Sequence, residues 1–89
     1  MSSDPLTTMI NEADTPGSWA EAATMVRTRV TIGGATASDL HHLMVKGWRV
    51  LAEDSRDNRI TDQEFANIAG FMTRRMVDVL DTAVRESGV

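Results

Sequence analysis

The stretch Asp62–Arg85, DQEFANIAGFMTRRMVDVLDTAVR, decides the fold class of this chain. Apolar residues recur every three or four positions along it, which is the period of one face of an α-helix. They form one continuous stripe: Phe65, Ile68, Ala69, Met72, Met76, Val79, Leu80 and Ala83. The stretch therefore predicts a helix over 62–85, about 36 Å long at a rise of 1.5 Å per residue.

Two shorter segments upstream show the same period, and none shows the strict alternation typical of a strand. In the first, over about 19–30, the shared face carries Trp19, Ala22, Ala23, Val26 and Val30. In the second, over about 39–52, it carries Leu40, Leu43, Met44, Gly47 and Leu51. The pair Gly33-Gly34 separates them, and glycine both breaks a helix and permits positive φ. The sequence predicts an all-α fold, a small bundle of three main helices at about 19–30, 39–52 and 62–85.

A Ser or Thr followed three residues later by an acid precedes each predicted helix. In such a capping box the hydroxyl accepts from the backbone amide three residues on, and the acid reaches back to the hydroxyl residue's own amide. The three pairs are Ser18 with Glu21, Thr36 with Asp39, and Thr61 with Glu64. The middle box is the weakest, because Asp is shorter than Glu, and Ser38 is an alternative cap there.

Residues 1–17 form a separate N-terminal segment, and residues 18–89 a single helical domain. Pro5 suits the first turn of a helix, and Leu6, Met9 and Ile10 could dock on the core. The segment is either a short docked fourth helix or a loose tail. Because the predicted helix 62–85 is about twice as long as its partners, the rest of its stripe is covered either by the N-terminal segment or by another chain. We favour self-association, as a homodimer or larger homo-oligomer, through its distal half.

Composition narrows the function classes. The chain has 89 residues, a net charge of −4 and a pI of about 4.9, so a single acidic domain is expected. Nucleic-acid binders usually show a basic face, which makes nucleic acid an unlikely partner. A weaker alternative is a nucleic-acid accessory protein that binds nucleic acid through Arg27, Arg29, Arg74 and Arg75.

The absence of cysteine excludes disulfides, thiolate metal sites and cysteine nucleophiles. No apolar run approaches the about 20 residues that span a bilayer, and the N-terminus lacks the pattern of a secretory signal. We therefore expect a cytoplasmic protein that does not enter a membrane. Eight of the nine basic residues are Arg, which suggests a GC-rich bacterial or phage genome.

The stretch 53–64, EDSRDNRITDQE, admits a second interpretation. With Ile60 at the eighth position of a twelve-residue loop, it resembles an EF-hand calcium loop. The coordinating positions would then be Glu53, Ser55, Asp57, Arg59, Thr61 and Glu64. Against this, Glu replaces Asp at the first position, Asn58 replaces Gly at the sixth, and Arg56 brings positive charge to a cation site. A turn at Asp57, followed by the Thr61 capping box, explains the stretch without a metal, and we favour it.

No catalytic motif or cofactor fingerprint is present, and we expect neither an enzyme nor a cofactor. His41 and His42 are adjacent on the predicted helix 39–52, whereas two histidines that bind one metal ion on a helix lie four residues apart. Solvent-facing or half-buried histidines are the simpler interpretation, and we predict no metal site outside the calcium alternative.

The function that remains is a non-enzymatic interaction module, a regulator, inhibitor or assembly adaptor that binds a protein partner through helix faces. The residues expected to bind it are Phe71, Arg74, Arg75, Trp48 and His41. Phe71 lies off the main stripe beside two Arg, a composition typical of interface hot spots. The alternative is that it packs under the N-terminal segment. Trp48 belongs to a second stripe on its helix, with His41, Val45 and Ala52, and an ordinary core position is the interpretation we favour for it.

Overall fold

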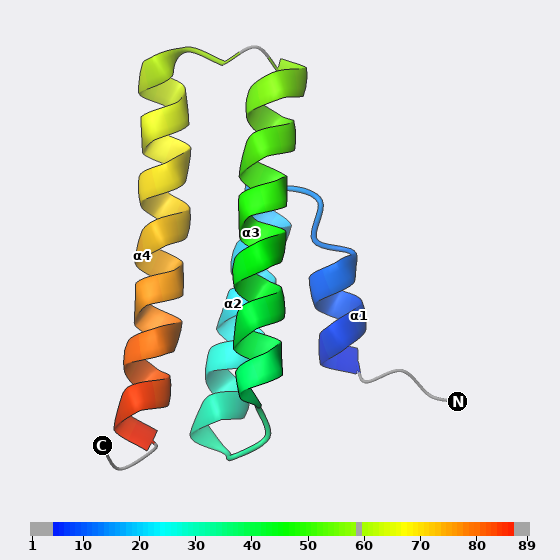
Figure 1. Cartoon of the computed structure of the whole chain (residues 1–89), viewed down its shortest axis with the longest axis vertical. Helices are drawn as coiled ribbons and strands as arrows, with labels where there is room; N and C mark the ends of the chain where they lie inside the picture. Colours follow the sequence, from blue (N-terminus) through cyan, green and yellow to red (C-terminus); the bar gives the residue numbers. More distant parts are fainter. Residues whose placement is uncertain (1–4, 59, 87–89) are drawn as a thin grey trace.

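The computed structural model describes residues 5–58 and 60–86, and over these residues the chain is all-α, as predicted. The described part contains four helices: α1 (Pro5–Asn11), α2 (Pro16–Thr31), α3 (Ala37–Asn58) and α4 (Asp62–Glu86) (Figure 1). The N-terminal segment is a docked helix rather than a loose tail, because Leu6 and Ile10 of α1 are buried. Within the described residues, no helix combines the length and the apolar character needed to cross a membrane.

Helix α2 is the centre of the bundle. It contacts α4 most extensively, then α3, and α1 packs against α2 and α3. Helices α3 and α4 run in opposite directions on the same side of α2, and they touch each other much less than either touches α2 (Figure 1). The space between α3 and α4 is therefore closed by α2 on one side only.

The core lies around α2 and draws on every helix. Trp19, Ala22, Ala23 and Val26 have exposed fractions of 1% or less, which confirms the face predicted for this helix. From the other elements the buried apolar residues are Leu6, Ile10, Ala13, Leu43, Val50, Leu51, Met72 and Val79. Along α4 only two members of the predicted stripe are fully buried, while Phe65 and Leu80 remain about 40% exposed. One apolar flank of α4 consequently lacks a neighbour among residues 5–58 and 60–86.

Two of the three predicted capping boxes form. At α3, the Thr36 amide donates to the Asp39 carboxylate at 2.8 Å, and the Asp39 amide donates to the Thr36 hydroxyl at 3.3 Å. At α4, the amides of Thr61 and Glu64 donate to each other's side chains at 3.2 and 3.1 Å. Both pairs satisfy amides that a helix start leaves without partners.

The capping box of α2 forms between Thr15 and Ser18, and not between Ser18 and Glu21 as predicted. Helix α2 begins at Pro16, three residues before the expected start, and Thr15 is its N-cap. The Ser18 amide donates to Thr15 Oγ1 at 3.1 Å, and Ser18 Oγ accepts from the Thr15 amide at 3.0 Å. Ser18 therefore takes the role of the acid in the box, and Pro16 is preset for the first helical position by its fixed φ.

Helix α3 is longer than the predicted 39–52 and continues to Asn58. The stretch 53–58 contains neither Gly nor Pro, so its polar residues extend the helix at little cost. The turn expected at Asp57 is therefore wrong, since this residue lies in α3. The break predicted between α2 and α3 is confirmed, because Gly33 has a φ of 79° and the Gly34 amide donates to the Arg29 carbonyl at 2.7 Å.

Candidate protein-binding groove

Trp19 forms the floor of a groove between α3 and α4. Its indole comes from α2, is 1% exposed, and donates from Nε1 to the backbone carbonyl of Leu43 on α3 at 2.9 Å. This hydrogen bond satisfies the one polar atom of a buried tryptophan. It also fixes the distance between α2 and α3 at this level of the bundle.

Gly47 is the residue that lets the indole approach α3. A β-carbon at position 47 would come within 2.9 Å of the Trp19 ring, closer than real β-carbons approach other atoms. The absence of a side chain at Gly47 therefore allows Trp19 of α2 to approach α3 closely. Only glycine leaves room for the floor of the groove.

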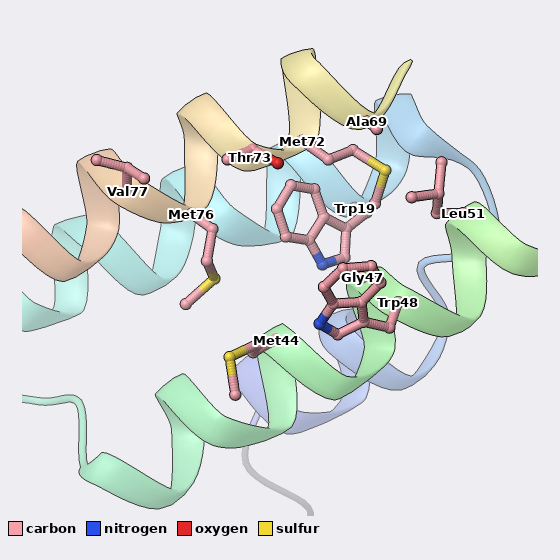
Figure 2. A pocket seen from close by; sticks show the side chains of 10 residues that line it. All are labelled: Trp19, Met44, Gly47, Trp48, Leu51, Ala69, Met72, Thr73, Met76 and Val77. Carbon is pink, nitrogen blue, oxygen red and sulfur yellow. The ribbon is translucent and has the colours of Figure 1, made fainter. Parts of the chain in front are cut away.

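The groove opens opposite α2 and has a volume of about 200 Å³. Three methionines line its walls, with Met44 on α3 and Met72 and Met76 on α4 (Figure 2). The full lining comprises Trp19, Met44, Gly47, Trp48, Leu51, Ala69, Met72, Thr73, Met76 and Val77. None of these residues carries a charge, so the groove suits an apolar ligand surface.

Trp48 lies at the groove with 68% of its surface exposed, which makes the core position favoured from the sequence wrong. The cause is the spacing of the helices. Helix α3 buries Leu43 and Val50, while α4 makes few contacts with α3 and covers none of the second stripe. His41, Val45 and Ala52, the other members of that stripe, are also exposed.

The other expected anchors lie on a different surface, along α4. The Arg75 guanidinium is 5.7 Å from the centre of the Phe71 ring, within cation–π range. Phe71 is 41% exposed, and α1 makes no contact with α4, so the packing of Phe71 under the N-terminal segment is wrong. Phe71 and Arg74 border a hollow with Ala66, Asn67 and Gly70. The structure thus groups Phe71, Arg74 and Arg75, and separates them from Trp48 and His41 on α3.

The loop that the calcium alternative requires is not formed. Glu53 and Ser55 lie in α3, as does the backbone of Asp57, and Arg59 is outside the described residues. Thr61 and Glu64 bond to each other's backbone amides in the capping box of α4. Across residues 5–58 and 60–86, no three His, Asp or Glu side chains are grouped in a way that could hold a metal ion.

The four Arg named for nucleic-acid binding are spread over two helices. Arg27 on α2 forms an ion pair of 2.9 Å with Asp78 on α4, so its charge is balanced within the bundle. Arg75 stacks on Phe71, and Arg74 borders the hollow beside it. Lys46, the only lysine, lies 3.6 Å from Asp14.

Sequence reasoning missed the groove itself. It assigned Met44, Met72 and Met76 to buried stripes, and it gave Val77 no role. The available signal was the mid-helix Gly47 together with three methionines at helical spacing, since methionine is frequent at adaptable binding surfaces. Comparison of the chain with family models, with curated proteins and with solved structures yields no match.

Proposed function

We propose that this protein is a non-enzymatic interaction module whose groove between α3 and α4 binds an amphipathic helix of a partner protein. The observation that carries the proposal is Trp48, which is 68% exposed at the edge of an uncharged groove. A large aromatic side chain beside an apolar groove is typical of an interface hot spot. A regulator, inhibitor or assembly adaptor, bacterial or phage-encoded and working in the cytoplasm, is the role that we propose for such a module.

The shape and lining of the groove favour a helix as the ligand. Its two walls are the facing sides of α3 and α4, and helix-in-groove recognition uses apolar anchors every three or four residues. Methionine side chains can change conformation to fit different apolar anchors. Burial of the exposed part of Trp48, on the order of 150 Å², would contribute about 4 kcal/mol before the entropic costs of binding.

A second contact belongs to the same proposal, the self-association expected through the distal half of α4. Val77, Leu80 and Val84 lie there and are 58%, 41% and 54% exposed. They leave apolar surface on α4 that none of the four described helices covers. This contact and the groove are adjacent, because Val77 also lines the groove.

The test is a comparison of three immobilised proteins in host lysate: the wild type, Trp48→Ala and Ile32→Ala. Ile32 is the matched control, since it is 72% exposed in the turn after α2 and does not line the groove. We expect the wild type and Ile32→Ala to retain the same protein at the same yield, and Trp48→Ala to lose it. Equal recovery by all three proteins would show that the groove is not the binding site.

A further inference from the structure

Gly70 is a mid-helix glycine that the packing of its own chain does not explain. Glycine lowers helix stability relative to alanine, so its presence inside α4 has a cost. At Gly47 the cost is explained, because Trp19 occupies the place of a β-carbon. At Gly70 a β-carbon would meet nothing within 4 Å. A close approach from outside the chain would account for the glycine.

Gly70 belongs to an exposed row of residues with the spacing of a coiled-coil seam. Successive members are separated by four, three, four, three and four positions, which is the a/d pattern of a heptad repeat. We call this row the outer seam: Ala66, Gly70, Thr73, Val77, Leu80 and Val84. All six residues are exposed, and none is charged. Helix α4 thus carries a buried face against α2 and, beside it, a second face able to pack on a helix.

Side-chain size changes along the outer seam. Ala66 and Gly70 at its start are small, Leu80 and Val84 at its end are larger, and Thr73 and Val77 in the middle are similar in size. Parallel pairing of two such seams would set glycine against glycine and leave a gap. Antiparallel pairing would set each small residue against a large one. The seam is therefore complementary to itself in one orientation only.

We propose that the outer seam binds the outer seam of a second copy of this chain in antiparallel orientation, with Gly70 opposite Leu80. The three layers would be Ala66 against Val84, Gly70 against Leu80 and Thr73 against Val77, each occurring twice about a two-fold axis. This inference rests on the proposed self-association through α4, and it adds the orientation, the register and the reason for Gly70.

The area of the contact indicates how strong the dimer is. A seam from Ala66 to Val84 is about 27 Å long, and a strip about 10 Å wide covers about 270 Å². A standard stable interface buries about 800 Å² per partner, so the seam alone supports a weak, transient dimer. In such a dimer Met44 and Trp48 stay outside the contact, and their side of the groove remains open to the partner helix.

The first experiment changes side-chain size in the Gly70–Leu80 layer and measures the dimer dissociation constant by sedimentation equilibrium. A β-carbon at position 70 meets no atom of its own chain within 4 Å, so the thermal unfolding of Gly70→Leu should be unchanged or shifted upward. The Kd of its dimer should rise about tenfold from overpacking. The double variant Gly70→Leu with Leu80→Ala restores a small residue opposite a large one and should return close to the wild-type Kd. Arg75→Leu is the matched control, since it adds leucine on the opposite side of α4.

The second experiment tests the orientation, and the absence of cysteine from the chain makes it direct. Ala66→Cys and Val84→Cys proteins are mixed under mild oxidation. Antiparallel pairing predicts a rapid mixed disulfide between the two proteins and slow linkage of Val84→Cys with itself. Rapid self-linkage of Val84→Cys with little mixed product would overturn the antiparallel orientation.

The experiments distinguish a failure of self-association from a failure of the groove and from a failure of the register. A wild-type chain that stays monomeric up to about 1 mM would overturn both the self-association and this inference. The groove would still be judged by the Trp48→Ala comparison. A Gly70→Leu protein that dimerises as tightly as the wild type would overturn the register alone and leave self-association standing.

Discussion

The indole of Trp19 occupies the space that a β-carbon on residue 47 would need, with ring atoms 2.9 Å from that position. This contact joins α2 to α3 at the floor of the groove, together with the hydrogen bond from the indole to the Leu43 carbonyl. A one-carbon change at position 47 therefore acts on the stability of the bundle and on the shape of the groove at once.

Gly47→Ala should destabilise the protein. Alanine would gain about 1 kcal/mol of helix propensity over glycine, but the overpacking against a buried indole costs about 1–3 kcal/mol, so a net loss is expected. Urea unfolding at low micromolar protein measures the difference. Gly70→Ala is the matched control in open space on α4, and it should raise stability by about 1 kcal/mol. Equal gains for both variants would contradict the close contact with Trp19.

Fluorescence should separate the two tryptophans. Trp19→Phe leaves only Trp48, which is 68% exposed, and its emission should be red-shifted and readily quenched by iodide. Trp48→Phe leaves only Trp19, 1% exposed, whose emission should be blue-shifted and protected. Addition of a partner that fills the groove should shift the Trp48 emission to the blue. A Trp48 signal that is protected in the free monomer would contradict the open groove.

Hydrophobic periodicity explains which parts of the fold and the groove could be predicted from the sequence and which could not. The stripe over 62–85 and the Thr61–Glu64 box defined α4 to within one residue of its observed end at Glu86. The polar stretch 53–58 was ambiguous, because its residues suit a solvated helix end as well as a turn with carboxylate ligands. Periodicity also identifies an apolar face without identifying the neighbour that covers it. The exposure of Trp48 depends on the separation of α3 from α4, which the sequence pattern does not report.

The start of α4 offers a test of the capping box against the calcium alternative. Glu64→Gln keeps an acceptor that can reach the Thr61 amide, so unfolding stability should change by less than about 0.5 kcal/mol. Thr61→Ala removes the hydroxyl that accepts from the Glu64 amide and should cost about 1 kcal/mol. Both are measured by urea unfolding, in EDTA and in calcium. A calcium-dependent rise in wild-type stability that disappears in Glu64→Gln would support the ion instead.

The variant Phe71→Ala tests whether the group of Phe71, Arg74 and Arg75 takes part in partner binding. Phe71→Ala removes a ring that is 41% exposed and stacked under Arg75, so helicity should be unchanged and stability should fall by about 1 kcal/mol or less. If Phe71 contacts the partner, recovery of the partner should fall with this variant while circular dichroism stays the same. A joint loss of helicity and binding would show that Phe71 supports the fold.

Arg74 provides the sharpest test of the register. It directly follows Thr73 of the outer seam, on one flank of α4. In the proposed antiparallel pair the same flank of both copies lies on one side of the interface, which places the two Arg74 side chains near each other at its centre. Like charges at such a distance repel, so Arg74→Gln should tighten the dimer about twofold to fourfold.

Added salt should also tighten the wild-type dimer, because it screens the same repulsion. Arg75→Gln removes an equal charge from the opposite side of the helix and should leave the Kd unchanged. A weaker dimer with Arg74→Gln would mean that Arg74 meets an acid, such as Asp81 of the other copy, and that the register is shifted by one heptad.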